Sequence, residues 1–324
     1  MLRLLYRLKR KTEQTFKPVI LVTGCGSGIG WALAELLYSC EGYRVVVTAR
    51  SRSIARLKLR FRESERFRVL SLDIRDENER LAVIGEIEDT WGGVDILVNN
   101  AGIMYRSVLE HMTERDEQNQ MVTNYLGPSG LIRAVLPHMR AAGRGKIINV
   151  SSVSGMLAMP TMASYSASKH ALEGMSEALW FEMKPLGINV SLVQPGFIRS
   201  NSFKNVYYTE NSRPDVCVDA EYSDYYKNMT PFVERLMNLS LATPEKISKL
   251  ILKVIRTENP PMYIPATLDA FIFSYLKRWI PRRILFPLLF ALLPKARQWG
   301  KAYTKRRQSR QGHQVPKDEI RKSA

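Results

Sequence analysis

One stretch decides the fold class of this 324-residue chain: Val19-Ile20-Leu21-Val22-Thr23-Gly24-Cys25-Gly26-Ser27-Gly28-Ile29-Gly30. A short apolar run of strand-forming residues leads into a glycine-rich turn, and the turn leads into a segment with helical patterning. Glycines at such a junction allow a tight turn and a close approach to the backbone, while the first N–H groups of the helix attract an anion. The turn therefore predicts a site for a dinucleotide pyrophosphate, with contacts from Gly24, Ser27, Gly28, Ile29 and Gly30.

Beyond this stretch, short apolar runs alternate with helical segments as far as residue 265. Uninterrupted runs such as Val45-Val46-Val47 are typical of parallel strands buried on both faces. The alternation predicts an α/β fold: a single doubly wound Rossmann-type domain with a mostly parallel seven-stranded sheet. We expect strands at Val19 to Thr23, Arg44 to Thr48, Arg68 to Leu72, Ile96 to Asn99, Gly145 to Ser151, Asn189 to Gln194 and near Met262 to Ile264.

The composition divides the chain into three regions. Residues 1–17 form a basic N-terminal segment, residues 18–265 form the Rossmann domain, and residues 266–324 form an extension that is first hydrophobic and then basic. Within the domain, residues 201–240 are polar and rich in tyrosine, and they break the alternation. An insertion before the last strand predicts a substrate lid, and a packed surface excursion is the alternative.

The net charge of +17 is concentrated at the two ends of the chain, with +5 in residues 1–17 and +8 in residues 295–324. The basic tail has few interleaved aromatic side chains, so we expect no nucleic-acid partner. The three cysteines, at positions 25, 40 and 217, and the four histidines show no metal-ligand spacing. We therefore predict no metal. The odd number of cysteines and the absence of a signal-peptide pattern argue against a disulfide framework, so we predict reduced thiols in an intracellular protein.

The end of the second predicted strand distinguishes the two nicotinamide dinucleotides. An acidic side chain about 20 residues after the glycine-rich turn accepts from the ribose 2′-hydroxyl and repels a 2′-phosphate. Here Arg50 and Arg52 follow the strand instead, and they can bind a phosphate through charge-assisted hydrogen bonds. NADP is therefore favoured over NAD, although these arginines also begin a basic surface stretch. Asp73, after the third strand, is a candidate partner of the adenine amino group or a plain turn residue.

Tyr165 and Lys169 are four residues apart on a predicted helix, so their side chains share one face. Tyrosine is a weak base at its ordinary pKa of about 10, and a neighbouring ammonium favours the phenolate. The pair predicts proton exchange with an alcohol or a carbonyl. Ser152 ends a strand at the carboxyl edge of the sheet, where its hydroxyl would bind the substrate oxygen, with Ser151 as the alternative.

Five motifs in this order resemble the short-chain dehydrogenase/reductase family over residues 18–200. They are Thr-Gly-x-x-x-Gly-x-Gly at 23–30, Asn-Asn-Ala-Gly at 99–102, Asn124 in Thr-Asn-Tyr-Leu-Gly, Tyr-x-x-x-Lys at 165–169, and Pro195-Gly196. The resemblance implies a nicotinamide-dependent enzyme that acts on CH–OH groups.

The resemblance also implies a role for each matching residue. Tyr165 would transfer the proton, Ser152 would orient the carbonyl, and Lys169 would also bind the nicotinamide ribose. Asn124 would hold a water that relays protons to Lys169, and Asn99 would steady the sheet beside the adenosine ribose. The loop after the sixth strand would contact the nicotinamide through Pro195, Ile198 and Ser200.

Two helical stretches, Leu136 to Arg140 and Glu173 to Leu179, are similar to the branch of 17-beta-hydroxysteroid and retinol dehydrogenases. This branch implies a small lipophilic substrate that is steroid-, retinoid- or lipid-like. Reduction of a 3-keto lipid of the ketosphingoid type is the alternative, and a non-catalytic binding or scaffold protein is an alternative of another class. Family members commonly pair through the helices that carry Asn124 and Tyr165, so a homodimer or homotetramer is implied.

The C-terminal extension follows a predicted helix from Pro244 to about Arg256. Its apolar segments, Phe271 to Leu276 and Ile284 to Leu293, are flanked by Trp, Lys and Arg, and none reaches the roughly 18 residues that a membrane span needs. The pattern is typical of an interfacial anchor, which predicts attachment to the cytoplasmic face of a membrane. The alternative is that these segments cover the substrate pocket or form a subunit interface.

Overall fold

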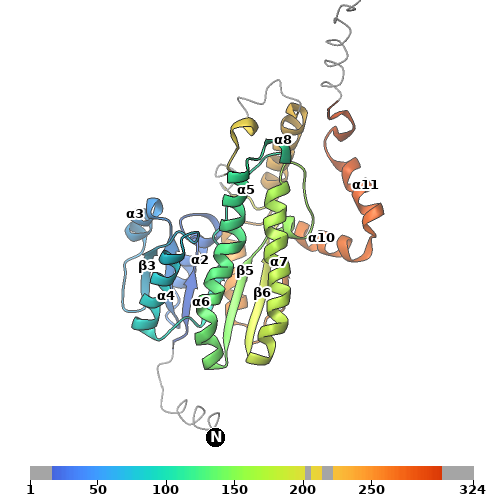
Figure 1. The fold of residues 1–324 in the computed structure, drawn as a ribbon. Helices are drawn as coiled ribbons and strands as arrows, with labels where there is room; N and C mark the ends of the chain where they lie inside the picture. The colour runs from blue at the N-terminus through green and yellow to red at the C-terminus, as the bar shows by residue number, and fades with distance from the viewer. Residues whose placement is uncertain (1–16, 201–205, 214–221, 301–324) are drawn as a thin grey trace, which may run out of the picture.

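Seven strands form one sheet in the order β3-β2-β1-β4-β5-β6-β7, and every neighbouring pair is parallel. The structure, a computed structural model, describes residues 17–200, 206–213 and 222–300 (Figure 1). The strands are β1 Val19–Val22, β2 Arg44–Ala49, β3 Phe67–Ser71, β4 Ile96–Asn99, β5 Gly145–Val150, β6 Ile188–Gln194 and β7 Tyr263–Pro265. The predicted α/β fold is confirmed, and the sheet is wholly rather than mostly parallel.

Several predicted features lie outside the described residues. They are the basic segment up to residue 16, the basic tail from residue 301, and two parts of the predicted lid, 201–205 and 214–221, the second of which contains Cys217.

Helices cover both faces of the sheet, because side chains of each central strand point alternately to its two sides. On β1, Ile20 and Val22 belong to one core, shared with helices α2 and α9, whereas Val19 and Leu21 belong to a second core, shared with α4, α6 and α7. The helices of the domain are α2 Gly28–Tyr38, α3 Ser51–Arg60, α4 Glu77–Trp91, α5 Glu114–Met121, α6 Gly127–Ala142, α7 Ala163–Met183, α8 Ser223–Leu239 and α9 Pro244–Arg256. Figure 1 shows α6 and α7 in front of β5 and β6.

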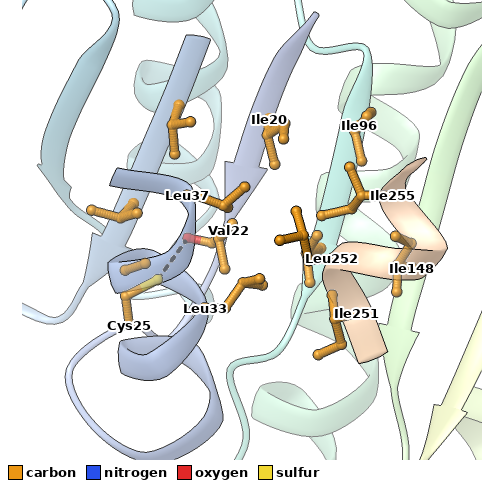
Figure 2. Close-up of a cluster of buried hydrophobic side chains, with 14 of the residues drawn as sticks. Ile20, Val22, Cys25, Leu33, Leu37, Ile96, Ile148, Ile251, Leu252 and Ile255 are labelled. Atoms are coloured by element: carbon orange, nitrogen blue, oxygen red, sulfur yellow. Dashed lines mark hydrogen bonds between the residues drawn. The ribbon is translucent and has the colours of Figure 1, made fainter. Parts of the chain in front are cut away.

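The first core joins the glycine-rich turn to the centre of the sheet (Figure 2). Ile251 of α9 is fully buried there, among side chains of the sheet and of α2. Cys25 lies in the same core, where its thiol donates to the Val22 carbonyl over 3.5 Å. Burial raises the pKa of this thiol to about 12, so the group is neutral at physiological pH.

The C-terminal extension forms two further helices, α10 Leu268–Trp279 and α11 Arg282–Leu292. Thr267 begins α10, since its hydroxyl accepts from the Ala270 N–H. Helix α11 continues through Pro287. Among the described residues, no helix combines the length and apolar character needed to cross a membrane.

Replacing Ile251 by Ala is expected to lower the free energy of unfolding by about 2–5 kcal/mol, because it leaves a cavity in a closed core. Leu59 is 89% exposed on α3, so Leu59→Ala serves as the control and should change stability by less than about 0.5 kcal/mol. Urea unfolding of the three proteins measures both effects. Equal stabilities would contradict the assigned packing of α9.

Candidate functional site

A cavity of about 810 Å³ lies along the carboxyl ends of the strands. Its walls include residues within two positions of the ends of six of the seven strands, from Gly24 after β1 to Pro195 after β6. Parallel strands bring these ends to one edge, which is where doubly wound sheets bind ligands. Thirteen predicted site residues line it: Gly24, Ser27, Gly28, Ile29, Arg50, Arg52, Asp73, Ser152, Tyr165, Lys169, Pro195, Ile198 and Ser200.

The glycine-rich turn packs directly against the residues that follow β4. Gly24 has a φ of +73°, and a Cβ there would lie 2.6 Å from the Ala101 Cα. Gly30 does not line the cavity. It packs against the turn itself, where a Cβ would lie 2.4 Å from the Gly24 carbonyl oxygen. Asn100 holds the turn by donating from Nδ2 to the carbonyls of Thr23 and Gly24, at 2.9 and 3.1 Å. Gly30 therefore serves packing, whereas Gly28 faces open space.

Arginines gather where β2 ends. The guanidinium groups of Arg50 and Arg52 both donate to the Tyr207 hydroxyl, at 3.3 and 3.2 Å. Arg56 donates to the Gly26 carbonyl at 2.6 Å and lies over the Trp31 ring. All three arginines line the cavity, so this end of it is strongly electropositive.

Asp73 lies at the same end, and Arg75 already binds its carboxylate. The Arg75 guanidinium donates to both oxygens, with the shortest distance 2.6 Å. These bonds hold the pKa of Asp73 below its ordinary value. Asp73 is therefore ionised, and both of its carboxylate oxygens accept from Arg75. Its contact with an adenine stays a prediction.

Asn99 was predicted to steady the sheet beside the cofactor, and its side chain joins two strands without lining the cavity. It is buried and donates from Nδ2 to the Asn149 Oδ1 at 2.9 Å, and Asn149 donates in turn to the Ser176 hydroxyl of α7. Successive residues of a strand point to opposite sides, so Asn99 joins β4 to β5 while Asn100 takes the position beside the cavity.

Ser152, Tyr165 and Lys169 meet at the end of β5. Helix α7 positions Tyr165 and Lys169, and the Ser152 hydroxyl lies close enough to the Tyr165 phenol to lower its pKa. The Lys169 ammonium donates to the Val150 carbonyl at 2.9 Å and lies 6.0 Å from the centre of the Tyr165 ring. The structure thus brings the three predicted residues into one cluster.

Burial acts on both ionisable groups of this cluster. It raises the pKa of Tyr165, which the bond with Ser152 opposes. It lowers the pKa of Lys169 to about 8, which the negative charge of Glu173 opposes. At neutral pH the lysine therefore still carries the positive charge that favours a phenolate.

Asn124 lies at a π-helical turn, Val122–Leu126, which joins α5 to α6. Its side chain accepts from the Ile103 N–H and donates to the Ile103 carbonyl and the Ser168 hydroxyl, each over 2.9 Å. A Cβ at Gly102 would lie 3.3 Å from the Asn124 Oδ1 and 3.7 Å from the Lys169 Nζ. The glycine therefore leaves open the space beside both polar atoms, where the relay water predicted from the resemblance would lie.

Glu173 is a buried acid one helical turn beyond Lys169. Its Oε1 accepts from the Ser151 hydroxyl at 2.7 Å and from the Gln194 side chain at 2.9 Å. Burial raises the pKa of Glu173, and these two bonds lower it. Ser151, the alternative to Ser152 in the sequence, thus donates its hydroxyl hydrogen bond to Glu173.

Helix α10 begins against the loop that follows β6. The Gly196 N–H donates to the Thr267 hydroxyl and the Phe197 N–H donates to the Asp269 carboxylate, both at 2.9 Å. The loop that carries Ile198 is therefore held by the C-terminal extension, a contact that the sequence did not indicate.

Apolar side chains line much of the remaining wall of the cavity: Met104, Met159, Met162, Val206, Val233 and Met237. Val233 and Met237 belong to α8, so the described part of the predicted lid does border the cavity. Arg106 is buried beside this wall, and burial lowers its pKa while Tyr208 and Glu234 raise it.

Comparison with known proteins agrees with this geometry. The family model described as short chain dehydrogenase matches residues 18–211. The chain belongs to the short-chain dehydrogenase/reductase family. It is therefore an NAD(P)-dependent oxidoreductase that acts on CH–OH groups.

Relatives in this family span most of the chain. A 3-ketodihydrosphingosine reductase of Bacteroides thetaiotaomicron is 34% identical over 82% of this chain and 94% of its own length. Dehydrogenase/reductase SDR family member 7B of Xenopus tropicalis is 33% identical over 65% of this chain and 70% of its own. Neither name is that of a steroid or retinol dehydrogenase, the branch that the sequence indicated.

Solved structures of short-chain dehydrogenases share the fold. One from Streptomyces avermitilis is 32% identical, with a TM-score of 0.68 over 82% of this chain and 97% of its own. A metagenomic short-chain oxidoreductase was solved with NADP, with 25% identity and a TM-score of 0.59 over 78% of this chain and 98% of its own. Another similar fold was solved with NAD, so family membership alone does not decide the cofactor of this enzyme.

Sequence reasoning missed several residues of this short-chain dehydrogenase site. Asn100 and Gly102 lie inside a recognised motif, and the position of Glu173 four residues after Lys169 was a usable signal for a shared helix face. Tyr207 carried no such signal, because it reaches the arginines across 155 residues of sequence.

Replacing Lys169 by Met is expected to change how stability depends on pH. Between pH 8 and the ordinary lysine value of 10.5, the unfolded chain binds a proton that the folded protein has released. Wild-type stability should therefore rise with pH relative to Lys169→Met, by about 3 kcal/mol across this window.

Urea unfolding of both proteins from roughly pH 7 to 11 measures this difference. The buried thiol of Cys25 has the opposite effect above its ordinary value of 9.0, but it is present in both proteins and cancels. A difference independent of pH would show that Lys169 is not buried as described.

Proposed function

We propose that the enzyme transfers a hydride between NADP(H) and a secondary alcohol or ketone of a lipophilic substrate. The observation that carries the proposal is the form of the cavity. It joins an arginine-rich end, the Ser152–Tyr165–Lys169 cluster and a methionine-rich wall in one continuous space.

The residues at the arginine-rich end fit NADP. The turn from Gly24 to Ile29 offers backbone N–H groups at the start of α2 to a pyrophosphate. Arg50 and Arg52 converge within hydrogen-bond distance of one hydroxyl, that of Tyr207, and a 2′-phosphate offers the same kind of acceptor with a negative charge. The position where NAD-specific sites carry an acid is occupied by arginine.

The cluster at the end of β5 fits acid–base chemistry on the substrate oxygen. When bound, the nicotinamide supplies or accepts the hydride. In reduction, Tyr165 gives its phenolic proton to the oxygen, while the Ser152 hydroxyl donates to that oxygen and stabilises its developing charge. The Lys169 ammonium stabilises the phenolate that remains, and in oxidation each proton moves in the reverse direction.

The methionine-rich wall favours a flexible apolar substrate, since methionine side chains adapt to irregular shapes. This wall supports the steroid-, retinoid- or lipid-like class. Similarity over 94% of a 3-ketodihydrosphingosine reductase favours a second candidate, the reduction of a long-chain 3-keto lipid. A panel that contains a steroid ketone, a retinoid and a 3-keto amino lipid separates them by kcat/KM.

Tyr165→Phe is expected to lower kcat/KM on the best substrate of this panel by roughly 10²- to 10⁴-fold, because the proton donor is lost. The affinity for NADPH should change little, because the variant removes only the phenolic hydroxyl. Steady-state kinetics and fluorescence titration give the two quantities. An unchanged kcat/KM would exclude Tyr165 as the proton donor, and no turnover of any panel member would favour a non-catalytic binding protein.

Arg50→Ala and Arg52→Ala are each expected to weaken NADPH binding by about tenfold, through loss of a charge-assisted bond worth about 1.4 kcal/mol. NADH binding should stay within about twofold, since NADH carries no 2′-phosphate. Arg62→Ala, on an exposed side chain near the end of α3, is the matched control. Equal losses for NADPH and NADH would contradict a 2′-phosphate site.

A further inference from the structure

Exposed apolar side chains are concentrated on α10 and α11. Ten of the eighteen large hydrophobic side chains exposed among the described residues lie between Leu268 and Leu292. We call these ten side chains the α10–α11 surface. Figure 1 shows the two helices extending away from the sheet and its covering helices.

Helix α11 is apolar on every side from Ile284 onward, and Leu285 is its only buried residue. Five others remain about half exposed or more: Ile284, Phe286, Leu288, Phe290 and Leu292. A helix that is hydrophobic all round normally lies in a non-aqueous environment. Among the described residues, the protein buries Leu285 fully and Leu289 in part. Another apolar phase or molecule would cover the rest of the helix.

The charge around this surface indicates whether a lipid membrane or a second copy of the chain covers it. Six cations lie on and beside the two helices: Lys277, Arg278, Arg282, Arg283, Lys295 and Arg297. The single acid of this stretch, Asp269, accepts from the Phe197 N–H. A second copy of the chain docked on the same surface would bring like charges together, whereas anionic lipid headgroups complement them.

We infer that the α10–α11 surface docks on an anionic lipid bilayer. An 11-residue helix is about 16 Å long, roughly half the thickness of the hydrocarbon core, so α11 lies in the plane of the interface. Trp279 is 72% exposed at the end of α10, next to Arg278. This is the arrangement that places an indole at the headgroup level, with cations facing the phosphates.

Docking here places the membrane close to the enzyme's cavity. The first turn of α10 holds the backbone of Gly196 and Phe197, and both residues line the cavity. A lipophilic substrate dissolved in the bilayer would therefore have a short path to Tyr165. This consequence rests on the proposed function, whereas docking itself does not.

Vesicle flotation with the full chain tests the inference. Vesicles of phosphatidylcholine with about 30% phosphatidylserine should bind the protein, and pure phosphatidylcholine should bind it at least about tenfold more weakly. The triple variant Phe286→Ser, Leu288→Ser, Phe290→Ser should lose at least about tenfold in binding to the anionic vesicles, as should Arg282→Glu with Arg283→Glu.

Leu59→Ser with Leu81→Ser is the matched control, because both leucines are exposed on other helices, at 89% and 55%. It should bind as wild type does. Trp279 fluorescence provides a second readout: brominated lipids should quench wild type more strongly than Trp279→Phe. Circular dichroism checks that each variant is folded.

Three outcomes would overturn the inference. Unchanged binding of the triple variant would place the contact in another part of the chain. Complete release at about 0.5 M salt would indicate adsorption by charge alone. Wild-type oligomers that dissociate in the triple variant, with no vesicle binding, would assign the surface to a second copy. None of these outcomes depends on turnover, so failure of the proposed function would be seen separately.

Discussion

The hydrogen bond from the Lys169 ammonium to the Val150 carbonyl is the interaction on which the site depends. It fixes α7 against the end of β5, the strand that leads into Ser152. Two further buried bonds hold α7: Asn149 of β5 donates to Ser176, and Asn124 of the π-helical turn donates to Ser168. Buried polar groups need such partners, because each unpaired one costs about 1–3 kcal/mol. These three buried hydrogen bonds therefore position Tyr165, Ser152 and Asn124 together.

The parallel sheet supplies the other half of the site. Since every strand runs in one direction, the turn after β1, the arginines after β2 and the serine after β5 meet at one edge. Close packing at this edge leaves room only for glycine at position 24 and holds the first turn of α2 beside Asn100. The dinucleotide end and the catalytic end are thus parts of one rigid frame.

The sequence predicted the features that depend on local pattern. Uninterrupted apolar runs predicted the strands to within about one residue of their observed bounds, and the glycine-rich turn predicted where the first helix begins. It failed where side chains meet across long separations. Asn99 steadies the sheet as the resemblance implied, but a motif does not tell which side of a strand faces the cavity, and the neighbouring Asn100 takes that position. Tyr207 and Asp269 were missed because their partners, Arg50 and Phe197, lie 157 and 72 residues away.

The charge on Lys169 depends on groups that never touch the substrate. Burial lowers its pKa to about 8, close to the pH at which it must stay protonated to favour the Tyr165 phenolate. The negative charge of Glu173 opposes this shift, but burial also raises the pKa of Glu173 itself. Two donors limit this rise, Ser151 at the end of β5 and Gln194 at the end of β6, because their hydrogen bonds favour the carboxylate. The pKa of Lys169 therefore depends on the hydrogen bonds of Glu173, and the loss of either donor would weaken the carboxylate that helps Lys169 stay protonated beside Tyr165.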